Sequence, residues 1–125
     1  MAYCVDLAEP CRTLVGLLRR FFDVSAVCCK VGGRALDAPL GTNGHDSIAC
    51  NPVGQVGALK QADCELNVIV GLCIGVDCVF AQASEVPVTT LFVKDKSLAN
   101  NPIGAVYSDY YLKEASLRSI TGTDE

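Results

Sequence analysis

The sequence predicts an α/β domain with a four-stranded parallel sheet between two helical layers, of the Rossmann-like or flavodoxin-like kind. An apolar run from Leu66 to Ile74, rich in β-branched residues, has the composition of a strand buried on both faces. Apolar segments of strand length also alternate with segments of helical spacing along the chain. With 125 residues, half of them hydrophobic, the chain is long enough for one core, so we expect a single domain over residues 1–125.

The first part of the chain predicts a strand, a helix and a second strand. Residues 2–5 are a short apolar strand. Pro10 suits a first helical turn, and the apolar spacing of residues 11–22 continues the helix to Asp23. Residues 24–31 predict the second strand. Because a helix connects these two strands, we expect them to be parallel.

A long connection rich in Gly, Pro, Asp and Asn covers residues 34–49. Loops of this length are commonly functional, so we expect it to cover the crevice at one edge of the sheet. It contains the only histidine, His45, which we expect to be solvated rather than a ligand.

Two helix starts of the same form follow. Asn51 is a good N-cap and Pro52 a good first residue, for a helix that runs to about Asp63. The residues Asn101-Pro102-Ile103-Gly104 repeat the form of Asn51-Pro52-Val53-Gly54 and predict a second capped helix, over residues 102–117.

The remaining elements are the central strand, a short helix and a fourth strand. The central strand covers residues 66–74, and Asp77 is the expected N-cap of a helix over residues 77–84. Pro87 precedes a strand over residues 88–93. The pattern βαβ(loop)αβαβα predicts the strand order 2-1-3-4, with a ligand crevice at the carboxyl ends of the strands, between strands one and three.

Eight cysteines are the main anomaly of the composition. No signal-peptide pattern begins the chain, so we expect a cytoplasmic protein whose cysteines form no disulfide framework. The cysteines are then core residues, metal ligands or reactive thiols. We expect Cys11 and Cys64 to be structural, because free cysteine is often buried.

Four thiols should converge at the carboxyl edge of the sheet. Cys4, Cys29 and Cys73 lie at strand ends, and Cys50 precedes a helix N-terminus, where the helix dipole favours a thiolate. Cys28 is the alternative to Cys29, and Cys78 is a further candidate for the same site. We predict a metal site made of five candidate ligands: Cys4, Cys28, Cys29, Cys50 and Cys73. Backbone contacts to a bound group are predicted at Asn51, Gly54 and Gly75.

Several motifs together resemble one protein family. They are Cys28-Cys29-Lys30-Val31-Gly32, Cys50-Asn51-Pro52-Val53-Gly54-Gln55, Gly71-Leu72-Cys73-Ile74-Gly75-Val76-Asp77, Pro87-Val88-Thr89-Thr90 and Val93-Lys94-Asp95. Nearly the whole chain resembles domain of unknown function 1847, a family of cysteine-rich prokaryotic proteins often labelled metal-binding. In the family pattern a further cysteine-rich segment lies upstream, and histidines stand in place of Val76 and near Asn100; this sequence lacks all three. The resemblance implies that a site using those histidines is altered here.

The first functional hypothesis is a metal- or iron–sulfur-binding protein, because thiolates select zinc or iron–sulfur clusters. The alternatives are a cysteine-dependent enzyme of sulfur transfer or thiol redox chemistry, with a redox or sulfur-carrier partner protein, and a non-catalytic binding domain. A net charge of −4 without a basic stripe argues against nucleic acid. No apolar run reaches the about 18 residues of a membrane span, so we expect no membrane partner either.

Overall fold

A computed structural model describes residues 1–33 and 48–108. Its core is a four-stranded sheet in which every neighbouring pair is parallel. The order β2-β1-β3-β4 confirms the predicted fold class and strand order. The strands are β1 (Ala2–Tyr3), β2 (Val27–Cys28), β3 (Asn67–Val70) and β4 (Val88–Phe92).

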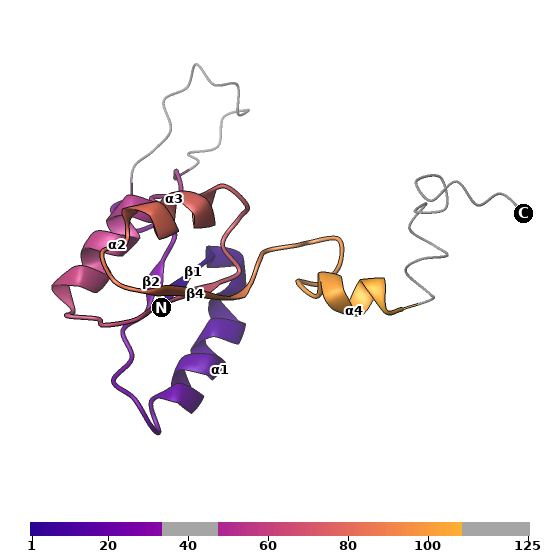
Figure 1. The fold of residues 1–125 in the computed structure, drawn as a ribbon, viewed down its shortest axis with the longest axis horizontal. Helices are drawn as coiled ribbons and strands as arrows, with labels where there is room; N and C mark the ends of the chain where they lie inside the picture. Colours follow the sequence, from indigo (N-terminus) through magenta and orange to yellow (C-terminus); the bar gives the residue numbers. More distant parts are fainter. Residues whose placement is uncertain (34–47, 109–125) are drawn as a thin grey trace, which may run out of the picture. The chain divides into compact units, whose positions relative to one another are not determined.

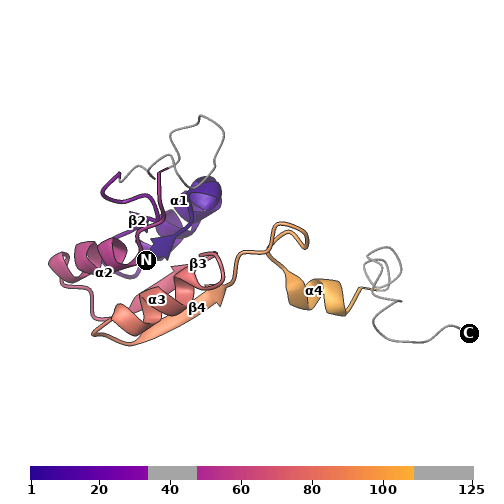
Figure 2. The same cartoon turned by 90° about the horizontal axis from the view of Figure 1, so that it is seen from above.

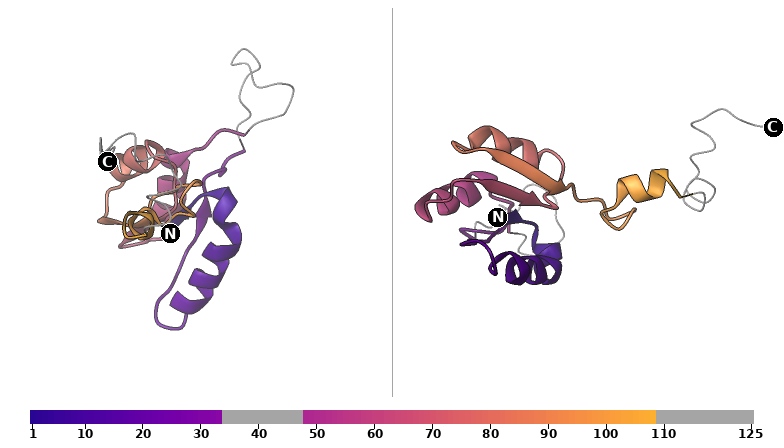
Figure 3. Two further views of the ribbon diagram at one scale, coloured as in Figure 1. Left: turned by 90° about the vertical axis from the view of Figure 1, so that its right-hand side faces the viewer. Right: turned by 60° about the horizontal axis from the view of Figure 1, so that its bottom comes forward.

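Helices flank this sheet on both faces (Figure 1). The chain leaves β1 through a 3₁₀ turn, η1 (Val5–Leu7), into α1 (Ala8–Leu18), which lies on one face. Helices α2 (Pro52–Gln61) and α3 (Val76–Ala83) pack against each other on the other face. In Figure 2, α2 lies towards β2 and α3 towards β3 and β4, and Figure 3 shows the layers from two further sides. Helix α4 (Pro102–Val106) comes after β4 in the chain.

Two apolar clusters fill the layers on the two faces of the sheet. Under α2 and α3, the side chains of Leu59, Ile69 and Phe80 are at most 1% exposed. Under α1, the buried residues include Cys11 and Val15. Full burial of a large apolar side chain contributes about 1.5–3 kcal/mol, so these clusters fix the sheet and its strand ends.

Strand β2 and helix α1 are shorter than the sequence patterns predict. After Cys28 the chain turns, with the Val31 N–H donating to the Cys28 carbonyl at 3.1 Å, which ends the strand three residues early. Helix α1 ends at Leu18 rather than near residue 22. The apolar periodicity continues past both ends, because it does not encode where backbone hydrogen bonding stops.

Two further differences concern α3 and α4. The N-cap of α3 is Gly75, at φ +88°, and the Asp77 carboxylate instead accepts hydrogen bonds from the N–H groups of Gly75 and Cys78. Helix α4 begins at Pro102 as predicted but ends at Val106. Residues 109–117 of that predicted helix, and residues 34–47 with His45, lie outside the described residues.

The repeated Asn-Pro-x-Gly form has a steric explanation. The Gly54 N–H donates to Asn51 Oδ1 at 2.8 Å, and the Gly104 N–H donates to Asn101 Oδ1 at 3.0 Å. A Cβ atom on either glycine would lie 2.4 or 2.2 Å from the Nδ2 atom of its capping asparagine. Glycine at this position therefore leaves room for the asparagine side chain to cap the helix.

By contacts the chain divides into two compact units, Met1–Lys94 and Asp95–Glu125. The first contains all four strands. In the second, the Asp95 carboxylate accepts hydrogen bonds from the N–H groups of Ser97 and Leu98, and the Asn100 side chain accepts one from the Asp95 N–H. In the part of the chain that the structure describes, no helix has the length and apolar character needed to cross a membrane.

Candidate thiol site

Every strand of the sheet leads into a cysteine or a lysine at its carboxyl end. Cys4 follows β1 directly and Cys29 follows β2 directly. Cys73 comes three residues after the end of β3, and Lys94 two residues after the end of β4. Because the strands are parallel, all four residues lie at the same edge of the sheet. Whether the three cysteines act together as one site stays a prediction.

Cys50 lies near the end of β2, because the next residue, Asn51, is hydrogen-bonded to that strand end and also caps α2. The Asn51 N–H donates to the Cys29 carbonyl at 2.8 Å, and Asn51 Nδ2 donates to the Val31 carbonyl at 3.3 Å. The same asparagine caps α2 with its side-chain oxygen. These contacts hold Cys50, the preceding residue, beside the turn that contains Cys29.

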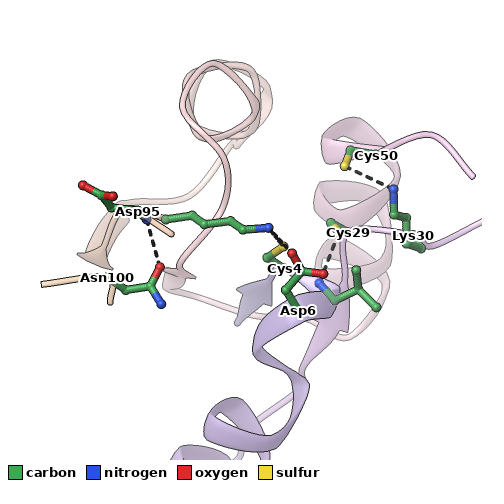
Figure 4. Close-up of polar contacts among 9 residues, drawn as sticks. Cys4, Asp6, Cys29, Lys30, Cys50, Asp95 and Asn100 are labelled. Atoms are coloured by element: carbon green, nitrogen blue, oxygen red, sulfur yellow. Dashed lines mark hydrogen bonds and ion pairs between the residues drawn. The ribbon is translucent and has the colours of Figure 1, made fainter. Parts of the chain in front are cut away.

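The Cys50 thiol is exposed and has a cationic neighbour. Lys30 Nζ lies 3.6 Å from Cys50 Sγ (Figure 4). The same ammonium group donates to the Ile48 carbonyl. Cys50 also directly precedes the N-cap of the ten-residue helix α2. An ammonium group and a helix N-terminus both stabilise a thiolate, and exposure lets it react.

Cys29 has the opposite environment. Its side chain is 1% exposed, and its sulfur accepts a hydrogen bond from the Val5 N–H at 3.4 Å. The pKa of the Cys29 thiol is raised to about 12, chiefly by burial; the neighbouring thiols of Cys50, Cys4 and Cys28 add to the rise, and the Val5 hydrogen bond opposes it. Cys29 is therefore a neutral thiol at physiological pH.

A half-buried lysine, Lys94, contacts the thiol of Cys4 at the end of β1. Lys94 Nζ donates to Cys4 Sγ at 3.1 Å and to the Asp6 carboxylate at 2.5 Å, and the Lys94 N–H donates to the Leu72 carbonyl. Figure 4 labels Cys4 and Asp6, the two side-chain partners. The Asp6 hydrogen bond is the largest cause that raises the pKa of Lys94; burial opposes it, and Cys4 and Cys73 add to it. Lys94 thus holds a positive charge between the thiols of strands β1 and β3.

Three further cysteines, Cys11, Cys64 and Cys78, have environments of their own. Cys11 is 2% exposed and packs under α1, as expected for a structural residue. Cys64 is half-buried before β3 and lines a cavity of about 440 Å³ with Lys60 and Glu85. Cys78 is exposed in the first turn of α3, next to Asp77.

The described residues do not form a ready metal site. Within residues 1–33 and 48–108, no three His, Cys, Asp or Glu side chains are grouped so that they could hold a metal ion. All eight cysteines are free thiols. Cys4 faces an ammonium group, which is an unfavourable neighbour for a metal cation. The five-cysteine metal site therefore stays a prediction.

The predicted backbone contacts to a cofactor also stay predictions. Asn51 and Gly54 together form the helix cap described above, and Gly75 begins α3 with a positive φ. Each of these residues thus has a role in local folding, whatever else it binds.

Sequence reasoning missed two members of the site, Lys94 and Asp6. In the sequence, Lys94 is recognisable only as the residue that follows the predicted fourth strand. Its contact partners Cys4 and Asp6 lie 90 and 88 positions away in the chain. The parallel topology was the available indication, since it brings the end of β4 to the edge that carries Cys4. Lys30 follows Cys29 in the chain, but its side chain contacts Cys50.

Comparisons with known proteins agree with the motif resemblance. Over 117 residues the chain is 41% identical to the uncharacterised protein MJ0455 of Methanocaldococcus jannaschii; the alignment covers 91% of this chain and 61% of the relative, so the chain spans less than two thirds of that protein. No solved structure matches. The model of a family described as protein of unknown function (DUF1847) matches residues 1–91, a stretch that includes all eight cysteines. The chain therefore belongs to the DUF1847 family.

Proposed function

We propose that the protein carries out thiol chemistry, sulfur transfer or thiol redox exchange, with Cys50 as the nucleophile. The observation that carries the proposal is the contact between Lys30 Nζ and the exposed Cys50 sulfur, 3.6 Å apart at the start of α2. A reactive cysteine needs a thiolate, a nearby positive charge and access to the substrate. Cys50 has a positive charge beside it and is accessible. The electrophile is a sulfur atom of a disulfide or a persulfide, delivered by a redox or sulfur-carrier protein.

Alkylation rates test this proposal. Cys50 should react with iodoacetamide faster than Cys78, which is also exposed near a helix N-terminus but has the Asp77 carboxylate beside it. Replacing Lys30 by Met should slow the alkylation of Cys50 by about 3–10-fold and leave Cys78 unaffected. Peptide mass spectrometry over a time course measures both rates in one sample.

The matched control is Lys60→Met. Lys60 is an exposed lysine that pairs with Glu85 instead of a thiol, so its replacement should change neither rate. Equal rates for Cys50 and Cys78, or an unchanged Cys50 rate in Lys30→Met, would rule out Cys50 as the activated nucleophile.

The second candidate function is binding of a soft metal or an iron–sulfur cluster by the edge thiols. It is supported by the proximity of Cys4, Cys28 and Cys50 to Cys29, whose mutual repulsion when ionised a metal would remove. Anaerobic purification followed by metal and sulfide analysis decides between the two. Stoichiometric metal that is lost in Cys29→Ser would favour this candidate, and a metal-free protein with a fast Cys50 would favour the first.

A further inference from the structure

Two thiols of opposite accessibility lie next to each other where β2 ends and α2 begins. Cys50 is exposed, whereas Cys29 is 1% exposed. A hydrogen bond of 2.8 Å from the Asn51 N–H to the Cys29 carbonyl joins the residue that follows Cys50 to Cys29. The Cys50 thiol is also among the neighbours that raise the pKa of Cys29, so the two thiols lie near each other. A disulfide between them requires Cα atoms about 4.4–6.8 Å apart.

We propose that Cys29 is the resolving thiol for Cys50, so that the two form a dithiol–disulfide pair that reduces a disulfide substrate. The inference rests on the proposed nucleophilic role of Cys50. The Cys50 thiolate attacks one sulfur of the substrate disulfide; a Cys50–substrate bond forms, the substrate S–S bond breaks, and the first substrate thiolate leaves. Cys29 then attacks the Cys50 sulfur, and its proton passes to the second substrate sulfur as that sulfur leaves. The substrate gains two electrons and the Cys29–Cys50 disulfide holds the oxidised state, which an external dithiol reduces again.

Burial gives this exchange a fixed order. An external disulfide can reach Cys50 but not the enclosed Cys29 sulfur, so the first attack belongs to Cys50. The Val5 N–H at 3.4 Å positions the Cys29 sulfur. Cys4, the other buried thiol near Cys29, is engaged by Lys94 at 3.1 Å, which makes it the weaker candidate for resolving the mixed disulfide.

The test treats the full chain with glutathione disulfide and maps its thiols by non-reducing peptide mass spectrometry. The wild-type chain should yield a Cys29–Cys50 cross-link without a lasting glutathione adduct. Cys29→Ser should instead accumulate about one glutathione per chain on Cys50, because nothing resolves the mixed disulfide. Cys50→Ser should give neither product at Cys29.

A matched variant settles which of two adjacent cysteines forms the cross-link. Cys28 and Cys29 share the tryptic peptide of residues 21–30, and Cys28→Ser leaves only Cys29 in it. This variant should behave as the wild type does. Circular dichroism of each variant, with Cys29→Ala as a second form of the buried substitution, confirms that the chain is folded.

The outcomes separate this inference from the proposed function. A lasting glutathione adduct on Cys50 in the wild type, or a dominant cross-link from Cys50 to Cys4 or Cys28, overturns the role of Cys29 and leaves Cys50 as the nucleophile. No adduct on Cys50 in folded Cys29→Ser or Cys29→Ala overturns both.

Discussion

Cys29 shows how one residue can be fixed by several neighbours at once. Its N–H donates to the Tyr3 carbonyl, its carbonyl accepts from the Asn51 N–H, and its sulfur accepts from the Val5 N–H. Its side chain belongs to the cluster under α2 and α3. From the sequence alone, either Cys28 or Cys29 could be the enclosed thiol. The turn after Cys28 determines that it is Cys29, and no local sequence pattern predicts this turn.

The raised pKa of Cys29 predicts a loss of stability in alkali. In the unfolded chain the thiol ionises near pH 9, whereas in the folded chain it keeps its proton up to a pKa of about 12. Between these values the unfolded state binds fewer protons, so the free energy of unfolding should fall as the pH rises, by up to about 1.4 kcal/mol per pH unit from this group. Urea unfolding under a reductant, at several pH values from 8 to 11, measures this slope.

Substitution isolates that contribution from other groups that titrate in the same range. Cys29→Ala should show a shallower decline than the wild type. Cys78→Ala removes an exposed thiol and should leave the slope as it is. Parallel curves for the wild type and Cys29→Ala would contradict the assignment.

Helix α2 was predicted closely because its start is encoded locally. An asparagine N-cap, a proline at the first position and a glycine that leaves room for the cap all lie within four residues, and the structure begins the helix at Pro52. The ends of elements were predicted less well, as the early end of β2 at the turn after Cys28 shows.

Two glycines in α2 should respond oppositely to the same substitution. A Cβ on Gly54 would lie 2.4 Å from Asn51 Nδ2, so Gly54→Ala should displace the cap and destabilise the protein by about 1 kcal/mol. Gly57 has no other atom within 4 Å of such a Cβ, so Gly57→Ala should stabilise it by up to about 1 kcal/mol through helix propensity. Urea unfolding midpoints compare the two variants, and equal shifts in the same direction would refute the steric account.

At the scale of the whole molecule, topology could be predicted and side-chain partners could not. Alternating apolar runs and helical stripes predict parallel strands in the order β2-β1-β3-β4, and the parallel direction brings Cys4, Cys29 and Cys73 to one edge. The contacts of Lys94 with Cys4 and Asp6 depend on how the end of β4 packs, which periodicity does not record. The length of the chain predicts one domain over residues 1–125, and an unfolding experiment on a shortened chain tests this prediction.

The division of contacts predicts that the first unit folds alone. All four strands and both apolar clusters lie within Met1–Lys94. A chain that ends after Lys96, which keeps Lys94 away from the new terminus, should unfold cooperatively in urea, with a free energy of unfolding within about 1 kcal/mol of that of the full chain. A broad transition or a much larger loss would show that the rest of the chain is part of the same cooperative unit.

The hydrogen bonds that Asn51 makes to Cys29, Val31 and Gly54 form a clasp between the end of β2 and the start of α2. The rate at which this clasp opens limits how often the Cys29 sulfur is accessible. The amide protons of Cys29, Asn51 and Gly54 are all held by bonds of this clasp or of the strand end that it closes. When the clasp opens, these protons become available for exchange with solvent, and the enclosed sulfur of Cys29 becomes available to large reagents in the same event. The exchange rates of these three backbone amides should therefore report how often the buried sulfur can be reached from outside, without any chemistry on the sulfur itself.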